Sequence, residues 1–256
     1  MRRLVEPAPF ANIIWLDAVD STNDWADRIM SAVTAEDGPD LPPTVLMAGW
    51  QAAGHGSGGK SWVSPAGGLY VTWLAWLPVE ALAVLPLAVG VAAATAAEAL
   101  VPGLSVGLKW PNDLVVDGRK LGGMLCHARS GGDRCWVRAG LGINVACTPE
   151  LAPGDPVCPT SLAEHGWGGQ LGPAIWALVE RFLRQLEAGL EEPGRAREQW
   201  QARLVHRLGD TMRVRIDTRI VEGRFAGLSP EGHLLLEVGG RVERVAAGEL
   251  VVRLEA

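Results

Sequence analysis

The chain has 256 residues, which is enough for one large domain with a smaller one beside it and for a sizeable buried core. Apolar residues make up 48% of the chain and charged residues 20%, the usual composition of a globular protein in water. The net charge of -6 argues against a surface that binds nucleic-acid duplexes, because such a surface is basic.

Two segments bear on membranes and export. The start, "MRRLVEPAPF", places a glutamate and two prolines where a signal peptide needs an apolar run. The stretch 81–101 is rich in alanine, carries Pro86 and Gly90, and is less apolar than a membrane span. We therefore expect a buried helix that starts near Pro86, and a cytoplasmic protein.

The four cysteines, Cys126, Cys135, Cys147 and Cys158, form no C-x-x-C pair and have no histidine at the spacing of zinc ligands. Reduced thiols in a reducing compartment are the favoured interpretation. We expect no metal held by protein side chains alone.

The first part of the chain predicts helices and strands in alternation. Residues 17–33 have helical apolar spacing after Ser21 or Thr22, either of which suits a helix cap. Residues 42–52 read as a strand with no polar face, and the β-branched and aromatic residues of 67–78 as another. Segments 104–110, 113–128 and 135–147 follow as strands joined by tight turns. Asp117-Gly118 favours a type I′ hairpin.

The last part changes character. Residues 173–192 and 194–208 show helical spacing with charges between the apolar positions. From Leu208 onward polar and apolar residues alternate, with glycine-rich turns, which is typical of a small all-β barrel. We predict a domain of residues 1–207 and a β domain of residues 208–256.

The stretch "GHGSGGKS", residues 54–61, matches the phosphate-loop pattern of nucleotide-hydrolysing enzymes. That loop must enter a helix, whose N-terminus helps to bind the phosphate. Here Ser64-Pro65 and Gly67-Gly68 break any helix, and a strand follows, so the match does not indicate that fold. The glycines still leave backbone N–H groups open to an anion, with Lys60 and Trp62 beside them. A plain flexible surface loop is the alternative.

A second motif is "KWPND", residues 109–113, followed after the hairpin by "RKLGG", residues 119–123. Pro111 stiffens the entry to the strand. Asn112 and Asp113 need hydrogen-bond partners at a strand edge. Lys120 is a cation whose glycine neighbours let a ligand approach the backbone. A charged hairpin that faces solvent is the alternative.

These residues together resemble the biotin–protein ligases. The resemblance spans nearly the whole chain and is carried by "DSTN" at 20–23, "QAAGHGSGGKSWVSP" at 51–65, "KWPNDLVVDGRKLGG" at 109–123 and "GLGINV" at 140–145. It implies an α+β fold: a class II synthetase-like catalytic domain with a mixed sheet and packed helices, plus a small C-terminal SH3-like β-barrel. No segment resembles the DNA-binding domain of some members, so the chain resembles the monofunctional type.

The resemblance also implies the reaction. The carboxylate of biotin attacks the α-phosphate of ATP, Mg²⁺ accompanies the phosphates, and a lysine of a biotin carboxyl carrier domain then takes biotin from the adenylate. No nucleic acid or membrane partner is implied, and the protein is expected to be a monomer or a homodimer.

Roles carry over by position. The catalytic residue is Lys120. The biotin-binding residues are Ser21, Thr22, Asn23, Gln51, Gly54, His55, Tyr70 and Gly123. The residues that bind ATP or the adenylate are Gly56, Ser57, Lys60, Trp62, Asn112, Lys120 and Asn144. For any one of them a plain core or capping role is the alternative, and Ser21 as a helix cap is the clearest case.

One departure from the family affects the glycine-rich loop. Members typically read Gly-Arg-Gly-Arg-x-Gly-Arg, whereas this chain has His55, Ser57 and Lys60 in place of the arginines. The departure weakens the expected hold on the adenylate unless Arg119 or Arg129 reaches the phosphate. Lipoate ligases and octanoyltransferases share the fold, and a non-catalytic biotin-binding protein is the other alternative.

Overall fold

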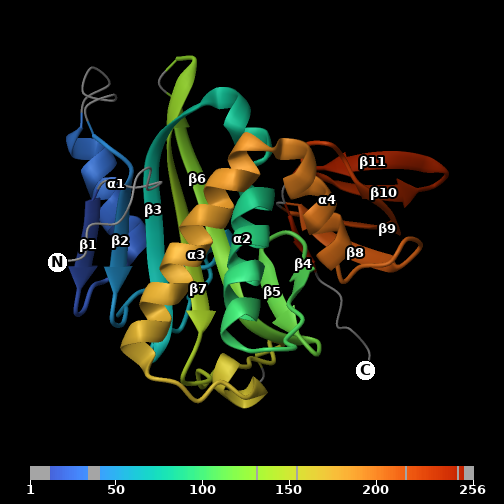
Figure 1. Cartoon of the computed structure of the whole chain (residues 1–256). Helices are drawn as coiled ribbons and strands as arrows, with labels where there is room; N and C mark the ends of the chain where they lie inside the picture. The colour runs from blue at the N-terminus through green and yellow to red at the C-terminus, as the bar shows by residue number, and fades with distance from the viewer. Residues whose placement is uncertain are drawn as a thin grey trace.

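The larger part of the protein is built on a mixed β-sheet. The computed structural model describes residues 12–33, 41–130, 132–153, 155–216, 218–246 and 248–250. Within these ranges the sheet has seven strands in the order β1-β2-β3-β7-β6-β5-β4 (Figure 1). The strands are β1 (Asn12–Leu16), β2 (Thr44–Ala48), β3 (Gly68–Pro78), β4 (Gly107–Lys109), β5 (Asp113–Val116), β6 (Arg119–Ser130) and β7 (Arg134–Asn144). The β1–β2 pair is parallel and the others are antiparallel.

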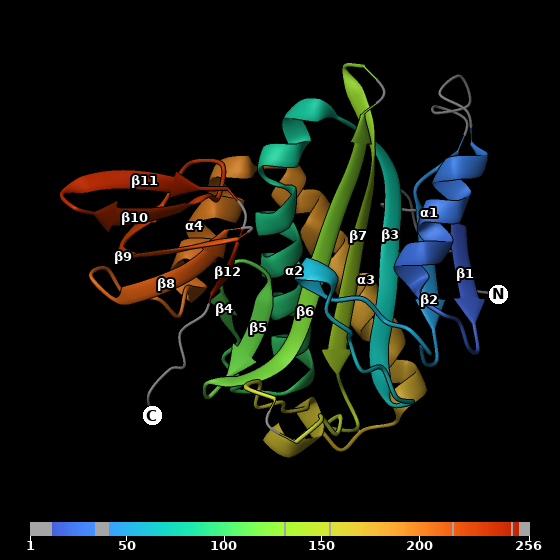
Figure 2. The same cartoon turned by 180° about the vertical axis from the view of Figure 1, so that it is seen from behind.

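Helices cover both faces of this sheet. One face carries α1 (Thr22–Ala32), which packs on β2, β3 and β7. The opposite face carries α2 (Leu85–Leu100), α3 (Leu171–Glu191) and α4 (Pro193–Arg203) (Figures 1 and 2). Short 3₁₀ turns are η2 (Ser57–Gly59), η3 (Val79–Ala83) and η4 (Leu162–His165).

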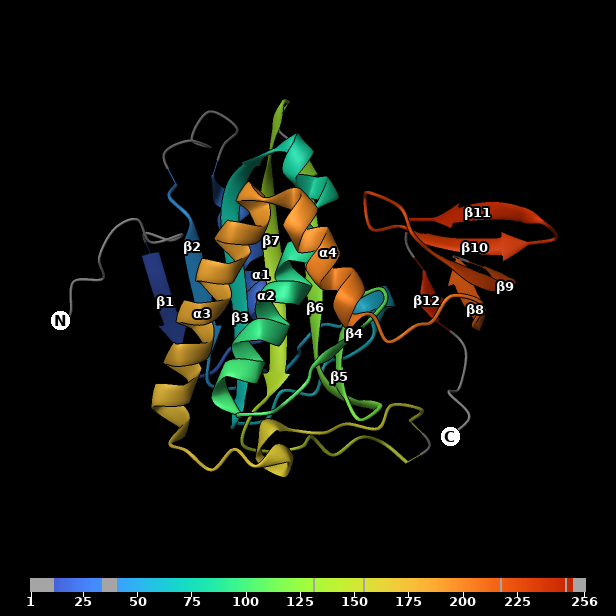
Figure 3. The ribbon, with the colours of Figure 1, turned by 45° about the vertical axis from the view of Figure 1, so that its right-hand side comes forward.

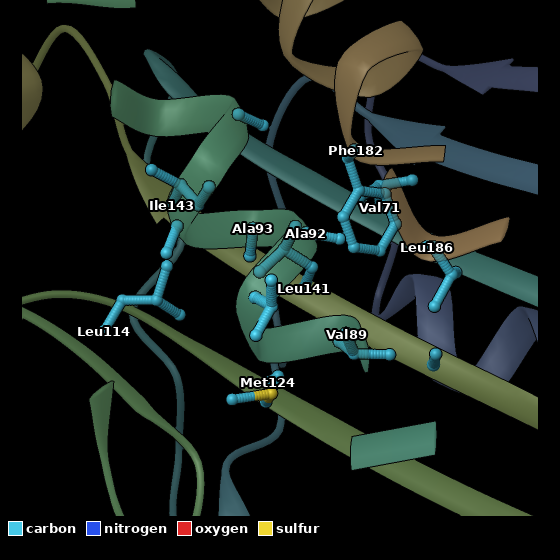
Figure 4. Close-up of a cluster of buried hydrophobic side chains, with 14 of the residues drawn as sticks. Val71, Val89, Ala92, Ala93, Leu114, Met124, Leu141, Ile143, Phe182 and Leu186 are labelled. Carbon is cyan, nitrogen blue, oxygen red and sulfur yellow. The ribbon is translucent and has the colours of Figure 1, made fainter. Parts of the chain in front are cut away.

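The main core lies between the sheet and α2. This helix begins at Leu85 with Pro86 in its first turn, as the sequence predicts, and most of its residues are buried. Its alanines let α3 and the sheet approach closely, so Ala92 and Ala93 lie between Phe182 and the strand residues Leu141 and Ile143 (Figure 4). In the part of the chain that the structure describes, no helix is long and apolar enough to cross a membrane.

The C-terminal part forms a second sheet at the β4–β5 end of the first (Figure 3). In its described residues the order is β11-β10-β9-β8-β12, all antiparallel. The strands are β8 (Thr211–Ile216), β9 (Arg219–Leu228), β10 (Leu234–Val238), β11 (Arg241–Val245) and β12 (Glu249–Leu250). The predicted α+β class with a small C-terminal β domain is confirmed. The boundary at 207/208 stays a prediction, and α4 and β8 end and begin on either side of it.

The predictions for the two loops hold. Asp117 and Gly118 have φ of 49° and 74°, the positive values that a type I′ hairpin requires. The glycine-rich stretch contains the short turn η2, and the next element after it is β3, so no helix receives the loop. The four cysteines are free thiols.

Candidate functional site

A pocket opens on the α1 side of the sheet, where the start of α1 and the glycine-rich loop meet strands β3, β6 and β7 and the residue before β5. In Figure 2 this loop passes in front of β6. The pocket brings together most of the residues that the sequence singles out, namely Ser21, Thr22, Asn23, Gln51, His55, Gly56, Ser57, Trp62, Asn112, Lys120 and Gly123. Segments more than 100 positions apart in the chain therefore line one site.

A chain of hydrogen bonds fixes the loop to the sheet and to α1. The hydroxyl of Thr72, fully buried on β3, donates to the Thr22 hydroxyl at 2.9 Å. The side-chain oxygen of Gln51 accepts from the backbone N–H of Thr22 at 2.8 Å and from its hydroxyl at 3.2 Å. The Gln51 amide nitrogen donates to Ser64 Oγ at 2.9 Å. These bonds leave Gln51 one amide hydrogen for a ligand, so its first role is to anchor the loop.

Ser21 stands at the N-cap of α1 but does not cap the helix with its side chain. Its backbone N–H donates to Asp20 Oδ1 at 2.8 Å, and the residue lines the pocket while it is only 1% exposed. The predicted capping position is correct and the predicted capping bond is wrong, because the residue faces the pocket. This placement favours a ligand-binding role for Ser21.

Two glycines of β7 make room for the polar side chains of the pocket. A Cβ on Gly140 would lie 2.0 Å from Asn23 Nδ2, and one on Gly142 would lie 2.5 Å from Trp62 Nε1. Both side chains therefore lie close against the backbone of the strand. Asn23 Oδ1 and Trp62 Nε1 are buried and have no hydrogen-bond partner among the described residues. Because such groups are costly to leave unpaired, they are suited to pair with a ligand.

Lys120 owes its position to a bulge in the β5–β6 pairing. Leu114 pairs with Gly122, but the next residue, Val115, pairs with Lys120, so one residue of β6 is skipped. A bulge redirects the side chains that flank it. The Lys120 ammonium lies 2.5 Å from Asp113 Oδ1 and 5.3 Å from the Trp62 ring centroid. Both charged side chains are about three-quarters buried, at 23% and 21% exposure.

The backbone of Lys120 is held on its other side by the segment 158–160. Its N–H donates to the carbonyl of Cys158 at 2.7 Å, and its carbonyl accepts from the N–H of Thr160 at 2.9 Å. Asn112 donates from its side chain to the carbonyl of Met124 at 2.9 Å, which ties the start of β5 to β6. Hydrogen bonds to neighbouring segments thus fix the backbone that carries the Lys120 ammonium.

An exposed pair of side chains joins the glycine-rich loop to α1. His55 Nε2 lies 2.8 Å from Asp24 Oδ2 on α1, with the two side chains 46% and 38% exposed. Gly54 closes the loop further down, since a Cβ there would lie 2.5 Å from the Trp62 carbonyl oxygen.

Four predicted residues, Gly54, Lys60, Tyr70 and Asn144, do not line this pocket. Lys60 is exposed. Tyr70 is buried beside the pocket and its hydroxyl donates to the carbonyl of Pro65 at 2.7 Å. Burial raises the pKa of this phenol above its usual range. Asn144 is 2% exposed and donates to the carbonyl of Thr160 at 2.8 Å. The hydrogen bonds of Tyr70 and Asn144 support the backbone beside the pocket.

The two arginines considered as replacements for the loop arginines are engaged elsewhere. Arg119 pairs with Glu164 at 2.6 Å and donates to the carbonyl of Pro159. Arg129 pairs with Asp27 at 3.2 Å and donates to the carbonyl of Met30. Neither residue lines the pocket.

Sequence reasoning missed several lining residues: Val71, Met124, Leu125, Gly140, Leu141 and Gly142. Alternate glycines inside an otherwise apolar strand were the signal for Gly140 and Gly142, because such glycines mark close approach by another group. The apolar members carried no signal that distinguishes them from core residues.

A larger cavity of about 940 Å³ adjoins the pocket. The two share Ser57, Asn112, Met124 and Leu125 in their walls, so they lie side by side. The far wall of the cavity comes from the C-terminal β domain and includes Arg215, Glu231 and His233. Among the described residues there is no group of three or more His, Cys, Asp or Glu placed to hold a metal ion.

Comparisons with known proteins agree with this geometry. Residues 25–144 match the model of the Biotin/lipoate A/B protein ligase family. A biotin–[acetyl-CoA-carboxylase] ligase of Mycobacterium tuberculosis is 33% identical, over 90% of this chain and 85% of its own. A biotin protein ligase of Aquifex aeolicus, solved in complex with biotin and ATP, matches with a TM-score of 0.72 at 27% identity over 94% of this chain and 98% of that chain. One of Leishmania major, in complex with biotinyl-5-AMP, matches with a TM-score of 0.59 at 26% identity over 92% and 99%.

Proposed function

The chain belongs to the biotin protein ligase family, and from this premise we propose that it attaches biotin to a lysine of a biotin carboxyl carrier domain through biotinyl-adenylate. Biotin occupies the pocket below the glycine-rich loop, and ATP occupies the adjoining cavity. The single observation that carries the proposal is the position of Lys120, in the pocket that adjoins the larger cavity and paired with Asp113.

In the first step an oxygen of the biotin carboxylate forms a bond to the α-phosphorus of ATP. The bond from that phosphorus to the bridging oxygen breaks, and pyrophosphate leaves with the electron pair. Negative charge accumulates at the α-phosphate, and a fixed cation there lowers the barrier because it needs no reorganisation. Lys120 supplies that cation, and Asp113 and the Trp62 ring hold it in place.

The head of biotin lies among the residues at the start of α1. Its ureido group offers N–H donors and a carbonyl acceptor, which suit Asn23 Oδ1, the Ser21 hydroxyl and the remaining amide hydrogen of Gln51. Trp62 lines the pocket and offers its ring face to adenine and its unpaired Nε1–H to a phosphate or ribose oxygen.

Magnesium enters with the nucleotide. Mg²⁺ keeps several waters and is bound through substrate phosphates with one or two carboxylates. The ion would supply charge neutralisation on the phosphates.

In the second step the amine of the carrier lysine attacks the carbonyl carbon of the adenylate. The bond from this carbon to the AMP oxygen breaks, AMP leaves, and the attacking nitrogen loses its proton to solvent.

The four free thiols support a reducing compartment such as the cytoplasm as the place of the reaction.

The test is biotin-dependent exchange of pyrophosphate into ATP, followed by transfer of biotin to a carrier domain. We expect exchange with biotin and none above background with lipoate or octanoate. Exchange that prefers lipoate would assign the chain to that branch of the family. Biotin binding without exchange would show a non-catalytic biotin-binding protein.

A further inference from the structure

Trp110 belongs by sequence to the larger domain and by packing to the smaller one. Its side chain is 3% exposed and lies in the hydrophobic core of the C-terminal β domain, together with Phe225, Val221 and Leu236. Its indole N–H donates to the carbonyl of Gly232 at 3.2 Å, across 122 positions of the chain. The core of the small domain is therefore completed by a residue from the "KWPND" segment.

The turn that receives Trp110 is itself held firmly. The backbone N–H of Ser229 donates to the carbonyl of His233 at 2.8 Å, and the N–H of Gly232 donates to the carbonyl of Ser229 at 2.9 Å. Gly232 has a φ of +79°, and a Cβ there would lie 2.9 Å from the Leu87 side chain on α2. The turn is thus closed between Trp110 and α2.

On its other side Trp110 is joined by a few bonds to the reaction site. Asn112, two residues on, exchanges hydrogen bonds with Met124: its side chain donates to the Met124 carbonyl, and its carbonyl accepts from the Met124 N–H, both at 2.9 Å. Asp113 follows and pairs with Lys120. A shift of the Trp110 side chain would move the start of β5 and with it the carboxylate that holds the cation.

We propose that Trp110 is a positioning residue for adenylate formation, through which the C-terminal β domain sets the place of Asn112 and Asp113 and so of Lys120. The inference rests on the proposed function. If Trp110 only held the two domains together, replacing another residue of that core would impair adenylation as much as replacing Trp110. Trp110 does not line the biotin pocket, but it borders the adjoining cavity together with Gly232. The KM for ATP is therefore measured beside kcat, and a raised KM for ATP with an unchanged kcat would show contact with the nucleotide and contradict the positioning role.

The experiment compares Trp110→Ala, Trp110→Phe and the control Val221→Ala in the full chain. Val221 lies in the same core cluster and is 7% exposed. Folding is checked by thermal unfolding, biotin binding by calorimetry, and adenylation by pyrophosphate exchange with kcat and KM resolved for biotin and for ATP.

We expect Trp110→Ala to lower kcat at least tenfold with the Kd for biotin within twofold of the parent. Trp110→Phe keeps the ring in the core and should recover kcat to within threefold. Val221→Ala should lower the unfolding temperature and leave kcat unchanged. If Val221→Ala lowers kcat as much as Trp110→Ala, or if Trp110→Ala keeps normal kcat, the positioning role is wrong.

Two further readouts keep the test decisive. If Trp110→Ala does not fold, Trp110→Leu replaces it, and a normal kcat in that folded variant contradicts the proposal. If the parent chain shows no biotin-dependent exchange, the proposed function fails by itself. Trp110 is then tested by whether Trp110→Phe, unlike Trp110→Ala or Trp110→Leu, keeps the biotin-induced quenching of Trp62 fluorescence, measured against Trp62→Phe.

Discussion

The ammonium of Lys120 lies 2.5 Å from a carboxylate oxygen of Asp113, and both groups are about three-quarters buried at the wall of the pocket. A buried charge must be paired or it destabilises the fold. Asp113 therefore holds the Lys120 side chain in place before the substrates arrive, and the incoming carboxylate and phosphate meet a group already in position.

Lys120→Ala should abolish adenylate formation and leave biotin binding measurable. Loss of one such charge donor typically costs about 10²–10³-fold in rate, or roughly 3 kcal/mol. Pyrophosphate exchange and calorimetry with biotin measure the two effects separately. Arg119→Ala removes the neighbouring cation, which pairs with Glu164 outside the pocket, and should change exchange by less than threefold. Equal losses in the two variants would contradict the role of Lys120.

Gly142→Ala should raise the KM for ATP, and Gly140→Ala should raise the Kd for biotin. The new methyl would displace the Trp62 indole in the first case and the Asn23 amide in the second, because the gaps are only 2.5 Å and 2.0 Å. We expect about tenfold in each case, since a displaced side chain loses a contact worth roughly 1.4 kcal/mol. Gly172→Ala is the control, because nothing lies within 4 Å of its Cβ position. If Gly142→Ala instead raised the Kd for biotin and Gly140→Ala raised the KM for ATP, the placement of the ligands would be wrong.

His55→Arg should strengthen retention of the adenylate. The His55–Asp24 pair is exposed and of little strength, whereas an arginine can donate two parallel hydrogen bonds to a carboxylate or phosphate. One charge-assisted hydrogen bond contributes about 1.5 kcal/mol, or roughly tenfold in residence time. Labelling of bystander lysines with biotin, in the absence of a carrier, should fall in His55→Arg and rise in His55→Ala. Equal labelling by all three proteins would show that another element retains the adenylate.

His206, whose ring packs against Phe225 of the small domain, should make the protein less stable in acid. Burial, and then the charge of Lys109, lowers the pKa of this imidazole from 6.5 to about 4. The unfolded chain binds the proton more readily, so the stabilisation is fully present above about pH 6.5 and is lost as the pH falls towards 4. The resulting loss in the free energy of unfolding is at most about 3 kcal/mol. The free energy of unfolding, measured with urea, should differ less between pH 7.5 and pH 4.5 in His206→Gln than in the parent or in His233→Gln. An unchanged difference in His206→Gln would contradict this prediction.

Much of the fold was readable because local patterns agree with the tertiary structure. The uninterrupted apolar run of β2 predicted a strand buried on both faces, and all five of its residues are buried. The alanine-rich segment after Pro86 predicted a buried helix, and Asp117-Gly118 predicted the hairpin, because these signals depend only on neighbours in the chain. The motifs around Gln51, Asn112 and Lys120 likewise indicated one site, and their side chains line one pocket.

Three features of the site were decided only by the tertiary structure. The bulge that turns Lys120 towards Asp113 depends on strand register, which no residue type in β6 encodes by itself. Gln51 was expected to bind biotin, but most of the hydrogen-bonding groups of its amide are bonded to Thr22 and Ser64, which come from other segments. Trp110 lies in the core of a domain that begins about 100 residues later. Each depends on contacts between distant segments, and such contacts exist only once the packed sheet and helices fix the distances between them.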